Sequence, residues 1–356
     1  MDRDILVLTQ CEIEETSIQR EEKEKMVNYP LVSIIVLNYN GQEFLKDCLG
    51  SVLSSEYPNF EVLFVDNNST DGSVELVREL FGNDPHLRII RNEANLGFCE
   101  GNNVGVRASK GKYVIFLNND TIVDPHWVKE LVNAIDKDLS IGAAQCKILR
   151  KGDRDVIDSA GGTFDKFGFA VRKGHGQLDR GQFDKVEEIP HAIAVAMVVR
   201  KDVLDEVGLF DPNFFIHLDN VDLCLRIHLN GHKIVFVPKS RVWHVGRGGI
   251  GAPGIYHTCK NRITIPLKNF EPLNSLKYTL IYGIFIIGMA LLFLLTRKLK
   301  LGIAAIRGLV WNIVNFKYIW SNRQWIQRKV RKMPDREILK TFGSAPTSIF
   351  RLIGAK

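Results

Sequence analysis

Carboxylate and amide side chains directly follow several apolar runs of this sequence. Asn118-Asn119-Asp120 comes after YVIFL, and Asp66 comes after FEVLFV. Divalent cations such as Mg²⁺ and Mn²⁺ prefer oxygen ligands, so Asp120 could hold one, and the cation could neutralise a departing diphosphate. Asp66 could accept hydrogen bonds from a nucleotide base or ribose. Each carboxylate also has a structural alternative, because Asp is common in turns after strands.

A second acidic group occurs in FFIHLDNVDLCLRIHLNG, residues 214–231. Asp219 and Asp222 stand three apart at the start of a predicted helix, where one can cap the helix and the other can face a cleft as a general base. His244 ends another apolar run, in VWH, and could be a second metal ligand. A histidine with structural contacts alone is the alternative.

The elements that must position these residues alternate between strands and helices. Short β-branched runs predict strands, and apolar residues at helical spacing predict helices between them. The expected strands are residues 31–37, 60–65, 88–91 and 113–117, and the expected helices are 42–54, 73–81 and 97–109. This alternation predicts a parallel α/β sheet, whose ligands bind outside the carboxyl ends of the strands. Residues 145–245 are richer in strands and predict a mixed extension of that sheet.

Residues 278–295, YTLIYGIFIIGMALLFLL, form an uncharged apolar run. About 20 apolar residues span a bilayer core, so the run predicts a transmembrane or re-entrant helix, with a buried core helix as the alternative. Lys277 precedes the run and Arg297-Lys298 follow it, so loop charge does not indicate an orientation. Residues 301–325 combine apolar side chains with three tryptophans and scattered cations, which is typical of a helix in the membrane interface.

The bulk composition fits one large globular domain with an appendage. The chain has 356 residues, 45% hydrophobic and 25% charged, with a net charge of +6. The first 29 residues predict an acidic tail and not a signal peptide. The six cysteines form no CxxC pair, which disfavours a zinc knuckle and, without a signal peptide, indicates reduced thiols in the cytosol. The positive charge after residue 296 lies beside the apolar run, which favours an anionic membrane surface over nucleic acid.

Seven motifs, taken in their order along the chain, resemble the family 2 glycosyltransferases of the GT-A fold, in particular their rhamnosyltransferase-like branch. They are VSIIVLNYNG, FEVLFVDNNSTDGS, NEANLGFCEGNNVG, YVIFLNNDT, DEVGLFDPNFF, DNVDLCLR and VWH. The resemblance covers residues 31–246, with weaker similarity over 256–270. It implies a Rossmann-like α/β fold with a mixed sheet flanked by helices, a nucleotide-sugar donor and a divalent metal, Mg²⁺ or Mn²⁺.

The resemblance also implies roles for the matching positions. Asp120 is the last member of a DxD-type motif and would hold the metal, with His244 completing the coordination. The catalytic base belongs to the segment DNVD. The donor pocket would comprise Asn38, Asn40, Asp66, Asn95, Gly97, Asn103, Asn118 and Asn119.

Three positions depart from the family pattern. Asn118 stands where the DxD motif begins with an acid, so the metal has one carboxylate fewer, and weaker affinity or a partly water-filled coordination shell is expected. Asn220 stands where many relatives carry the second carboxylate of Glu-Asp-x-Asp, and an amide cannot take a proton. Asp219 and Asp222 are therefore the catalytic candidates, with Asp219 as the base and Asp222 as the more structural of the two. Ala194 replaces a frequent Gly and predicts a narrower acceptor pocket.

Together these predictions describe an inverting glycosyltransferase at the cytoplasmic side of the cell membrane. It would move a sugar from a nucleotide-diphosphate sugar, with dTDP-rhamnose as one candidate, to a hydroxyl of a lipid-linked glycan in cell-surface polysaccharide synthesis. The competing hypothesis is a catalytically impaired nucleotide-sugar-binding or scaffold protein of the same fold. The predicted segments are an acidic tail (1–29), a catalytic domain (30–250) with donor (30–122) and acceptor (123–250) halves, a linker (251–276), a transmembrane or re-entrant helix (277–296) and a basic amphipathic tail (297–356).

Overall fold

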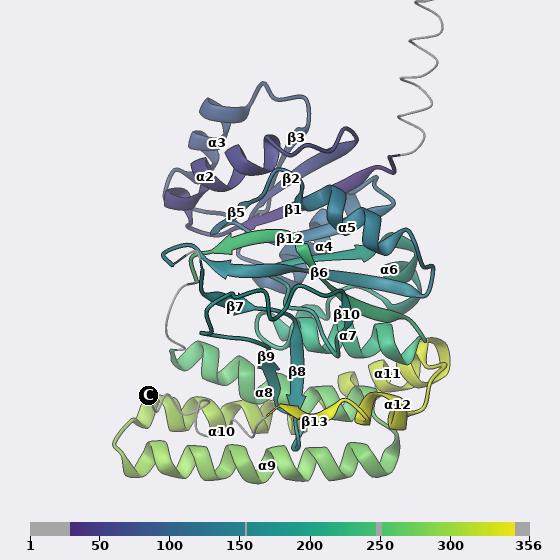
Figure 1. Ribbon diagram of the computed structural model, residues 1–356. Helices are drawn as coiled ribbons and strands as arrows, with labels where there is room; N and C mark the ends of the chain where they lie inside the picture. The colour runs from purple at the N-terminus through teal and green to yellow at the C-terminus, as the bar shows by residue number, and fades with distance from the viewer. Residues whose placement is uncertain (1–28, 154, 247–250, 346–356) are drawn as a thin grey trace, which may run out of the picture.

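A ten-stranded mixed sheet runs through the centre of the molecule (Figure 1). The computed structural model describes residues 29–153, 155–246 and 251–345. The main path of the sheet is β10-β12-β6-β11-β4-β1-β2-β3, with β5 paired to β12 and β7 paired to β6. A separate three-stranded sheet has the order β13-β8-β9.

The strands are β1 (Val32–Asn38), β2 (Phe60–Asp66), β3 (Leu87–Arg91), β4 (Tyr113–Asn118), β5 (Thr121–Val123), β6 (Ile141–Arg150), β7 (Ile157–Ser159), β8 (Gly162–Asp165), β9 (Ala170–Arg172), β10 (Glu187–Glu188), β11 (Ala196–Arg200), β12 (Lys233–His244) and β13 (Phe342–Ala345). The helices are α2 (Gln42–Leu53), α3 (Ser73–Phe81), α4 (Gly97–Ala108), α5 (Trp127–Ile135), α6 (Lys201–Val207), η1 (Pro212–Phe214), α7 (Asp219–Leu229), α8 (Ala252–Asn269), α9 (Pro272–Leu295), α10 (Leu299–Val314), α11 (Phe316–Trp325), η2 (Ile326–Val330) and α12 (Asp335–Leu339).

The predicted parallel half of the sheet is confirmed. Strand β1 pairs in parallel with both β2 and β4, and β2 pairs in parallel with β3. In this register Asn38 is opposite Asp66, and Leu37 is opposite Asn118. The carboxyl ends of these strands therefore meet at one edge, as expected for a parallel sheet that binds ligands there.

The second half of the sheet contains strands of both directions and extends the same surface. Strand β11 is antiparallel to both β4 and β6, and the long strand β12 runs parallel to β6. Because β12 ends at His244, it delivers that side chain to the edge where β1 and β4 end. This is the mixed extension that residues 145–245 predict.

Helices cover both faces of the sheet, so its central strands are apolar on both sides. Helices α2, α3 and α5 pack with one apolar core, and α4, α6 and α7 pack with the other. Strand β1 shows the consequence, because Val32, Ile34, Ile35 and Val36 are all fully buried. A sheet packed on both faces is the reason for the continuous β-branched runs in the sequence.

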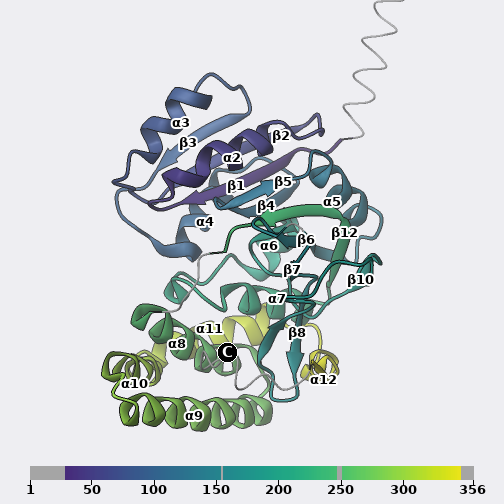
Figure 2. The ribbon, with the colours of Figure 1, turned by 60° about the vertical axis from the view of Figure 1, so that its left-hand side comes forward.

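The C-terminal helices form a further layer on the α7 side of the sheet (Figures 1 and 2). Residues 252–269, within the segment expected to be a linker, form helix α8, most of which is buried. It is buried because polar residues along it bond to the catalytic domain instead of to water, as Asn261 and Lys268 do. The tail before Tyr29 and residues 346–356 of the predicted basic tail lie outside the described residues.

Helix α9 coincides with the predicted apolar run. It is the one helix in the described part of the chain that is long and apolar enough by itself to cross a membrane. Helix α10 and the segment Phe316–Val330 pass the same test only together, and they are bent by 64°. About a third of the apolar window of α9 is buried against the rest of the molecule.

Candidate active site

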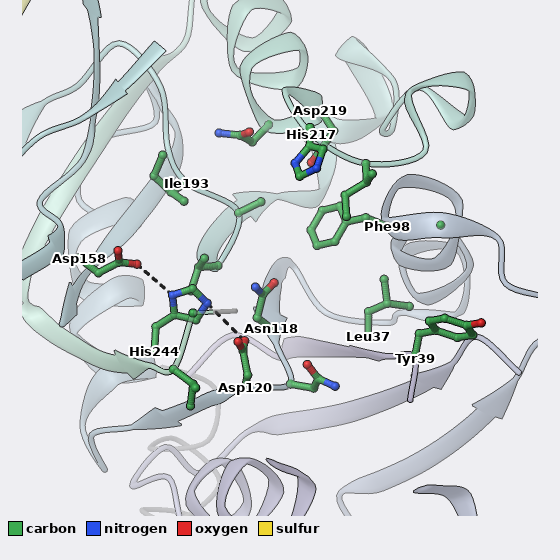
Figure 3. A pocket seen from close by; sticks show the side chains of 18 of the residues that line it. Leu37, Tyr39, Phe98, Asn118, Asp120, Asp158, Ile193, His217, Asp219 and His244 are labelled. Atoms are coloured by element: carbon green, nitrogen blue, oxygen red, sulfur yellow. Dashed lines mark hydrogen bonds and ion pairs between the residues drawn. The ribbon is translucent and has the colours of Figure 1, made fainter. Parts of the chain in front are cut away.

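A cavity of about 970 Å³ opens at the carboxyl edge of the sheet (Figure 3). Its walls come from the ends of β1, β4 and β12, from the start of α4, and from the loop that precedes α7. Of the predicted site residues, it is lined by Asn95, Gly97, Asn118, Asn119, Asp120, Asp219 and His244. The fold therefore brings together residues that are up to 149 positions apart in the chain, from Asn95 to His244.

A chain of two carboxylates and one imidazole forms one wall of the cavity. His244 Nε2 lies 3.3 Å from Asp120 Oδ1, and His244 Nδ1 lies 2.9 Å from Asp158 Oδ2. All three side chains are more than nine-tenths buried. Asp158, on β7, is a residue that the sequence analysis missed, because a single Asp in a short strand carries no motif.

The charges of Asp120, His244 and Asp158 depend on one another. Burial lowers the pKa of His244, but hydrogen bonds to Asp120 and Asp158 outweigh it and raise that pKa to about 9. Burial likewise raises the pKa of Asp158, but hydrogen bonds from His175 and His244 and the charge of Arg172 hold it well below its usual range. At neutral pH this wall therefore carries an imidazolium between two carboxylates.

The same residues fit a divalent cation. Two neighbouring ligands on an octahedral Mg²⁺ are about 3 Å apart, close to the 3.3 Å between Asp120 Oδ1 and His244 Nε2. Asp158 would fix the other imidazole nitrogen, as carboxylates commonly do behind histidine ligands. Within the described ranges, no group of three or more His, Cys, Asp or Glu side chains could hold a metal ion. The chain would therefore supply two ligands, and a diphosphate and water would supply the others.

Asp219 lies on another wall of the same cavity, beside His217 (Figure 3). It is the first residue of α7 and is only 6% exposed. Burial raises the pKa of Asp219 to about 6, with a smaller contribution from the charge of Asp222, while backbone hydrogen bonds oppose the shift. A carboxylate with a pKa near 6 is well suited to accept a proton at neutral pH.

The loop that leads into Asp219 has an unusual backbone conformation. Phe215, His217 and Leu218 have φ values of 64°, 70° and 58°. Left-handed backbone at a residue other than Gly costs on the order of 1–3 kcal/mol and concentrates at functional sites. The conformation turns the start of α7 toward the cavity, so the loop fixes the position of the candidate base.

Asn261, on α8, holds this loop in place. Its Nδ2 atom donates hydrogen bonds to the backbone oxygens of Phe214, Ile216 and His217, at 3.1, 2.9 and 2.7 Å. Asn261 is fully buried, so these bonds do not compete with water. The residue lies outside the strongest motifs of the sequence, and we assign it the role of positioning the loop before Asp219.

Asp222, the second catalytic candidate, does not line the cavity. It is fully buried, and its carboxylate lies 3.0 Å from Arg226 Nη2 and 3.3 Å from Lys268 Nζ. Asn269 Nδ2 also donates to it, at 2.8 Å. With its partners inside the protein, Asp222 joins α7 to α8, and its role in catalysis stays a prediction.

Four predicted donor-binding residues are not among the residues that line the cavity, namely Asn38, Asn40, Asp66 and Asn103. Asn38 Nδ2 donates to Asp66 Oδ1 at 3.0 Å, and Asn119 Nδ2 donates to Asn38 Oδ1 at 2.6 Å. Asn40 Oδ1 accepts from the backbone of Thr70, which ties the loops after β1 and β2 together. These bonds join the segments at the ends of β1, β2 and β4, and direct donor contact by Asn38, Asn40 and Asp66 stays a prediction.

The fourth of these residues, Asn103, also serves to join segments. Its Nδ2 donates to the backbone oxygen of Phe210 at 2.8 Å, and its Oδ1 accepts from the Phe210 amide at 3.1 Å. This reciprocal pair attaches α4 to the segment before η1. The structure thus divides the predicted donor-binding residues into those that line the cavity and those that hold neighbouring segments together. The sequence motifs do not make this distinction.

Gly97 shows why the motif NLGF requires glycine. Its φ is 75°, and a Cβ atom there would lie 2.5 Å from the ring of Phe215. Asn95 Oδ1 accepts a hydrogen bond from the Gly97 amide at 2.9 Å, which closes the turn before α4. The turn therefore packs closely against the loop that carries the candidate base.

Two residues that depart from the family pattern, Asn220 and Ala194, both line the cavity. Asn220 Nδ2 donates to the backbone oxygen of Ala192 at 2.6 Å, so the amide ties the start of α7 to the segment before β11. Ala194 lines the cavity and is 7% exposed. Asn220 thus has a structural bond that a carboxylate could not make, because a carboxylate has no hydrogen to donate to a carbonyl.

Comparisons with known proteins agree with this architecture. The model described as Glycosyl transferase family 2 matches residues 33–208. The O-antigen biosynthesis protein RfbC of Myxococcus xanthus is 29% identical over 223 residues, which are 60% of this chain and 17% of that protein. Glycosyltransferase AglE of Haloferax volcanii is 28% identical over 213 residues, which are 58% of this chain and 64% of that protein. The chain thus spans less than two thirds of the length of either relative.

Among solved structures, GalNAc-T7 with UDP, GalNAc and Mn²⁺ is similar over 85% of this chain and 57% of that one. The TM-score is 0.59 and the sequence identity is 19%. At this identity the likeness concerns the fold, and it identifies the mixed sheet with its flanking helices as a GT-A fold.

Proposed function

We propose that this chain is an inverting glycosyltransferase that uses a nucleotide-diphosphate sugar, and the match of residues 33–208 to the Glycosyl transferase family 2 model supports this proposal. The observation that carries the proposal is the single cavity in which Asp219 faces the wall formed by Asp120 and His244. A base on one side and a site for a diphosphate on the other are what a direct displacement at the anomeric carbon requires.

The proposed reaction uses the two walls for different tasks. Asp219 accepts the proton of the acceptor hydroxyl as its oxygen bonds to the anomeric carbon, and the bond to the diphosphate breaks on the opposite face. Asp120 and His244 would hold Mg²⁺ or Mn²⁺, which when bound neutralises the charge on the diphosphate. Asp158 keeps the imidazole of His244 oriented toward Asp120. The polar residues Asn95, Asn118 and Asn119 line the space left for the donor.

We further propose a lipid-linked saccharide as the acceptor and the cytoplasmic side of the cell membrane as the location. The apolar helix α9 supports this proposal, because an active site held at a membrane gains effective concentration on a membrane-bound acceptor. Among donors, the resemblance to the rhamnosyltransferase-like branch puts dTDP-rhamnose first in order of testing.

The transfer rate should fall in acid through protonation of Asp219. Its pKa is raised to about 6, mainly by burial, and only the ionised form can accept a proton. We expect log kcat to rise with unit slope below pH 6 and to level off above it. The measurement is kcat at saturating donor between pH 4.5 and 8. A rate that does not change between pH 5 and pH 7 would assign the proton transfer to another group.

A screen of nucleotide sugars for thermal stabilisation tests the donor and the metal together. We expect the correct donor to raise the melting temperature only with Mn²⁺ or Mg²⁺ present, because binding to the native state alone is stabilising. The His244→Ala variant should lose the metal-dependent part of the shift. A matched control is His126→Ala, since His126 is an exposed histidine that does not line the cavity.

The screen also separates the enzyme from a scaffold protein. A protein that binds donor with metal but neither transfers nor hydrolyses the sugar would be a nucleotide-sugar-binding scaffold, and the proposed reaction would be wrong. An equal thermal shift in the His244→Ala variant would remove His244 from the proposed metal site.

A further inference from the structure

One side of α9 is apolar and exposed from end to end. Leu273, Leu276, Leu280, Ile284, Ile287 and Leu291 recur every three or four residues, which places them on one side of the helix. Each is more than half exposed, and Leu273 at the start reaches 83%. A soluble surface rarely shows an uninterrupted row of large aliphatic side chains.

Helix α10 continues this surface. Leu299, Ile303, Ile306, Val310 and Ile313 follow the same spacing, and their exposed fractions lie between 43% and 76%. The two helices lie next to each other at the end of the molecule farthest from β3, in both views (Figures 1 and 2). Their exposed apolar residues together form a surface that we call the α9–α10 face.

The opposite side of α9 packs against α8, α10 and the β8–β9 hairpin. Tyr278, Tyr282 and Phe293 are buried at its start, middle and end. The hydroxyl of Tyr282 donates to the backbone oxygen of Gly168 at 2.9 Å, and the guanidinium of Arg262 lies 5.6 Å from the Tyr282 ring centre. If α9 crossed a bilayer, it would draw a charged arginine and the β8–β9 hairpin into hydrocarbon, which is strongly unfavourable.

The charge around the face is of one sign. Residues 272–325 contain seven Lys or Arg and no Asp or Glu. Lys277, Arg297, Lys298, Lys300 and Arg307 are exposed on α9, on α10 and at the turn between them. A second copy of this chain would bring like charges together across a two-fold interface, whereas an anionic lipid surface attracts each of them.

We propose that the α9–α10 face is a docking surface for an anionic bilayer, on which α9 and α10 lie in the plane of the membrane instead of crossing it. The aliphatic rows enter the boundary between headgroups and acyl chains, and the cations contact lipid phosphates. This inference deepens the proposed membrane location, but it does not rest on catalysis.

A single helix, α8, connects the docking surface to the loop that carries the candidate base. Helix α8 lies between them, since Asn312 of α10 donates to the backbone oxygen of Lys260 at 3.1 Å and accepts from Thr264 at 2.7 Å. The neighbouring Asn261 holds the loop before Asp219. One helix layer, about 8–10 Å between axes, therefore separates α10 from the cavity wall, which places the cavity within reach of an acceptor whose lipid lies in the same membrane.

Flotation with lipid vesicles tests the proposal on the full chain. We expect the protein to float with vesicles of phosphatidylcholine and phosphatidylglycerol, and less with phosphatidylcholine alone, because lipid charge attracts the basic rim. The double variant Ile284→Glu/Leu291→Glu should reduce the bound fraction at least about tenfold, since it places two carboxylates in the inserted row. Leu139→Glu is the matched control, because Leu139 is 70% exposed outside this face.

Depth measurements distinguish lying in the membrane from crossing it. Single labels would be attached at Leu273→Cys, Ile284→Cys and Leu295→Cys in a chain with Cys11→Ser, and their quenching by lipids with nitroxides at known depths would be measured. We expect all three labels at one shallow depth. A deep label at position 284 with shallow labels at 273 and 295 would establish a span and overturn the proposal.

Two further outcomes have definite meanings. Vesicle binding by Asp219→Asn, whose transfer rate should be strongly reduced, would support the docking surface independently of the proposed reaction. A stable dimer in light scattering that fails to float, and that Ile284→Glu/Leu291→Glu converts to a monomer, would show that a second copy covers the face and would overturn the proposal.

Discussion

Replacing Asp219 by Asn is expected to lower kcat by about 10²–10⁴-fold, the usual contribution of a positioned general base. The substitution keeps the shape of the side chain and removes its ability to accept a proton. Because Asp219 lies on the wall opposite Asp120 and His244 in the cavity, donor affinity should change little. The measurement is the steady-state rate of sugar transfer, with donor binding followed separately by thermal shift.

The control for this variant is Asp205→Asn, at an exposed carboxylate on α6. It should transfer sugar at the wild-type rate. Asp219→Asn should in addition lose the acid limb of the pH profile, if any residual rate can be measured, because the group with a pKa near 6 is gone. Near-normal turnover by Asp219→Asn would refute its role as the base.

Replacing Asp222 by Asn is expected to destabilise the fold by about 3–5 kcal/mol, the usual cost of removing one partner from a buried ion pair. Asp222 neutralises Lys268 and Arg226, whose side chains are 2% and 3% exposed. Lys268 is shared with Asp211, at 2.5 Å, so the variant would leave two buried cations facing one carboxylate. Urea denaturation of Asp222→Asn against the exposed Asp205→Asn control, which should lie within about 0.5 kcal/mol of wild type, measures the difference.

The destabilisation should depend on pH in a defined direction. Burial raises the pKa of Asp222, but the charges of Lys268 and Arg226 outweigh it and lower that pKa in the folded protein. A lowered folded-state pKa contributes stability above the unfolded value of about 3.9, and this contribution is lost as the pH falls through the folded value. The difference in the free energy of unfolding between wild type and Asp222→Asn should therefore be largest at pH 7 and should decrease in strong acid. A variant of normal stability that no longer transfers sugar would instead place Asp222 among the catalytic residues.

The sequence by itself determined the parallel half of the fold and the edge at which it binds ligands. Runs such as Ser33–Leu37 are apolar on both faces and end in Asn or Asp, and a strand buried on both sides leaves only its ends for polar chemistry. The helix that starts at Asp219 was likewise predictable, since its apolar face follows the helical period in the chain. These features depend on the pattern of neighbouring residues along the chain, which can be read from the sequence.

Only the tertiary structure decided which polar residues line the cavity and which support it. Asp158 meets His244 across 86 positions, Asn261 meets the loop before Asp219 across more than 40, and Asp222 meets Lys268 across 46. An isolated Asp or Asn has no periodicity, and its role depends on the partner that folding brings to it. The placement of α9 also depended on the tertiary structure. Its composition is typical of a membrane-spanning helix, but the hydrogen bond from Tyr282 to Gly168 that holds one of its sides against the protein forms only in the folded chain.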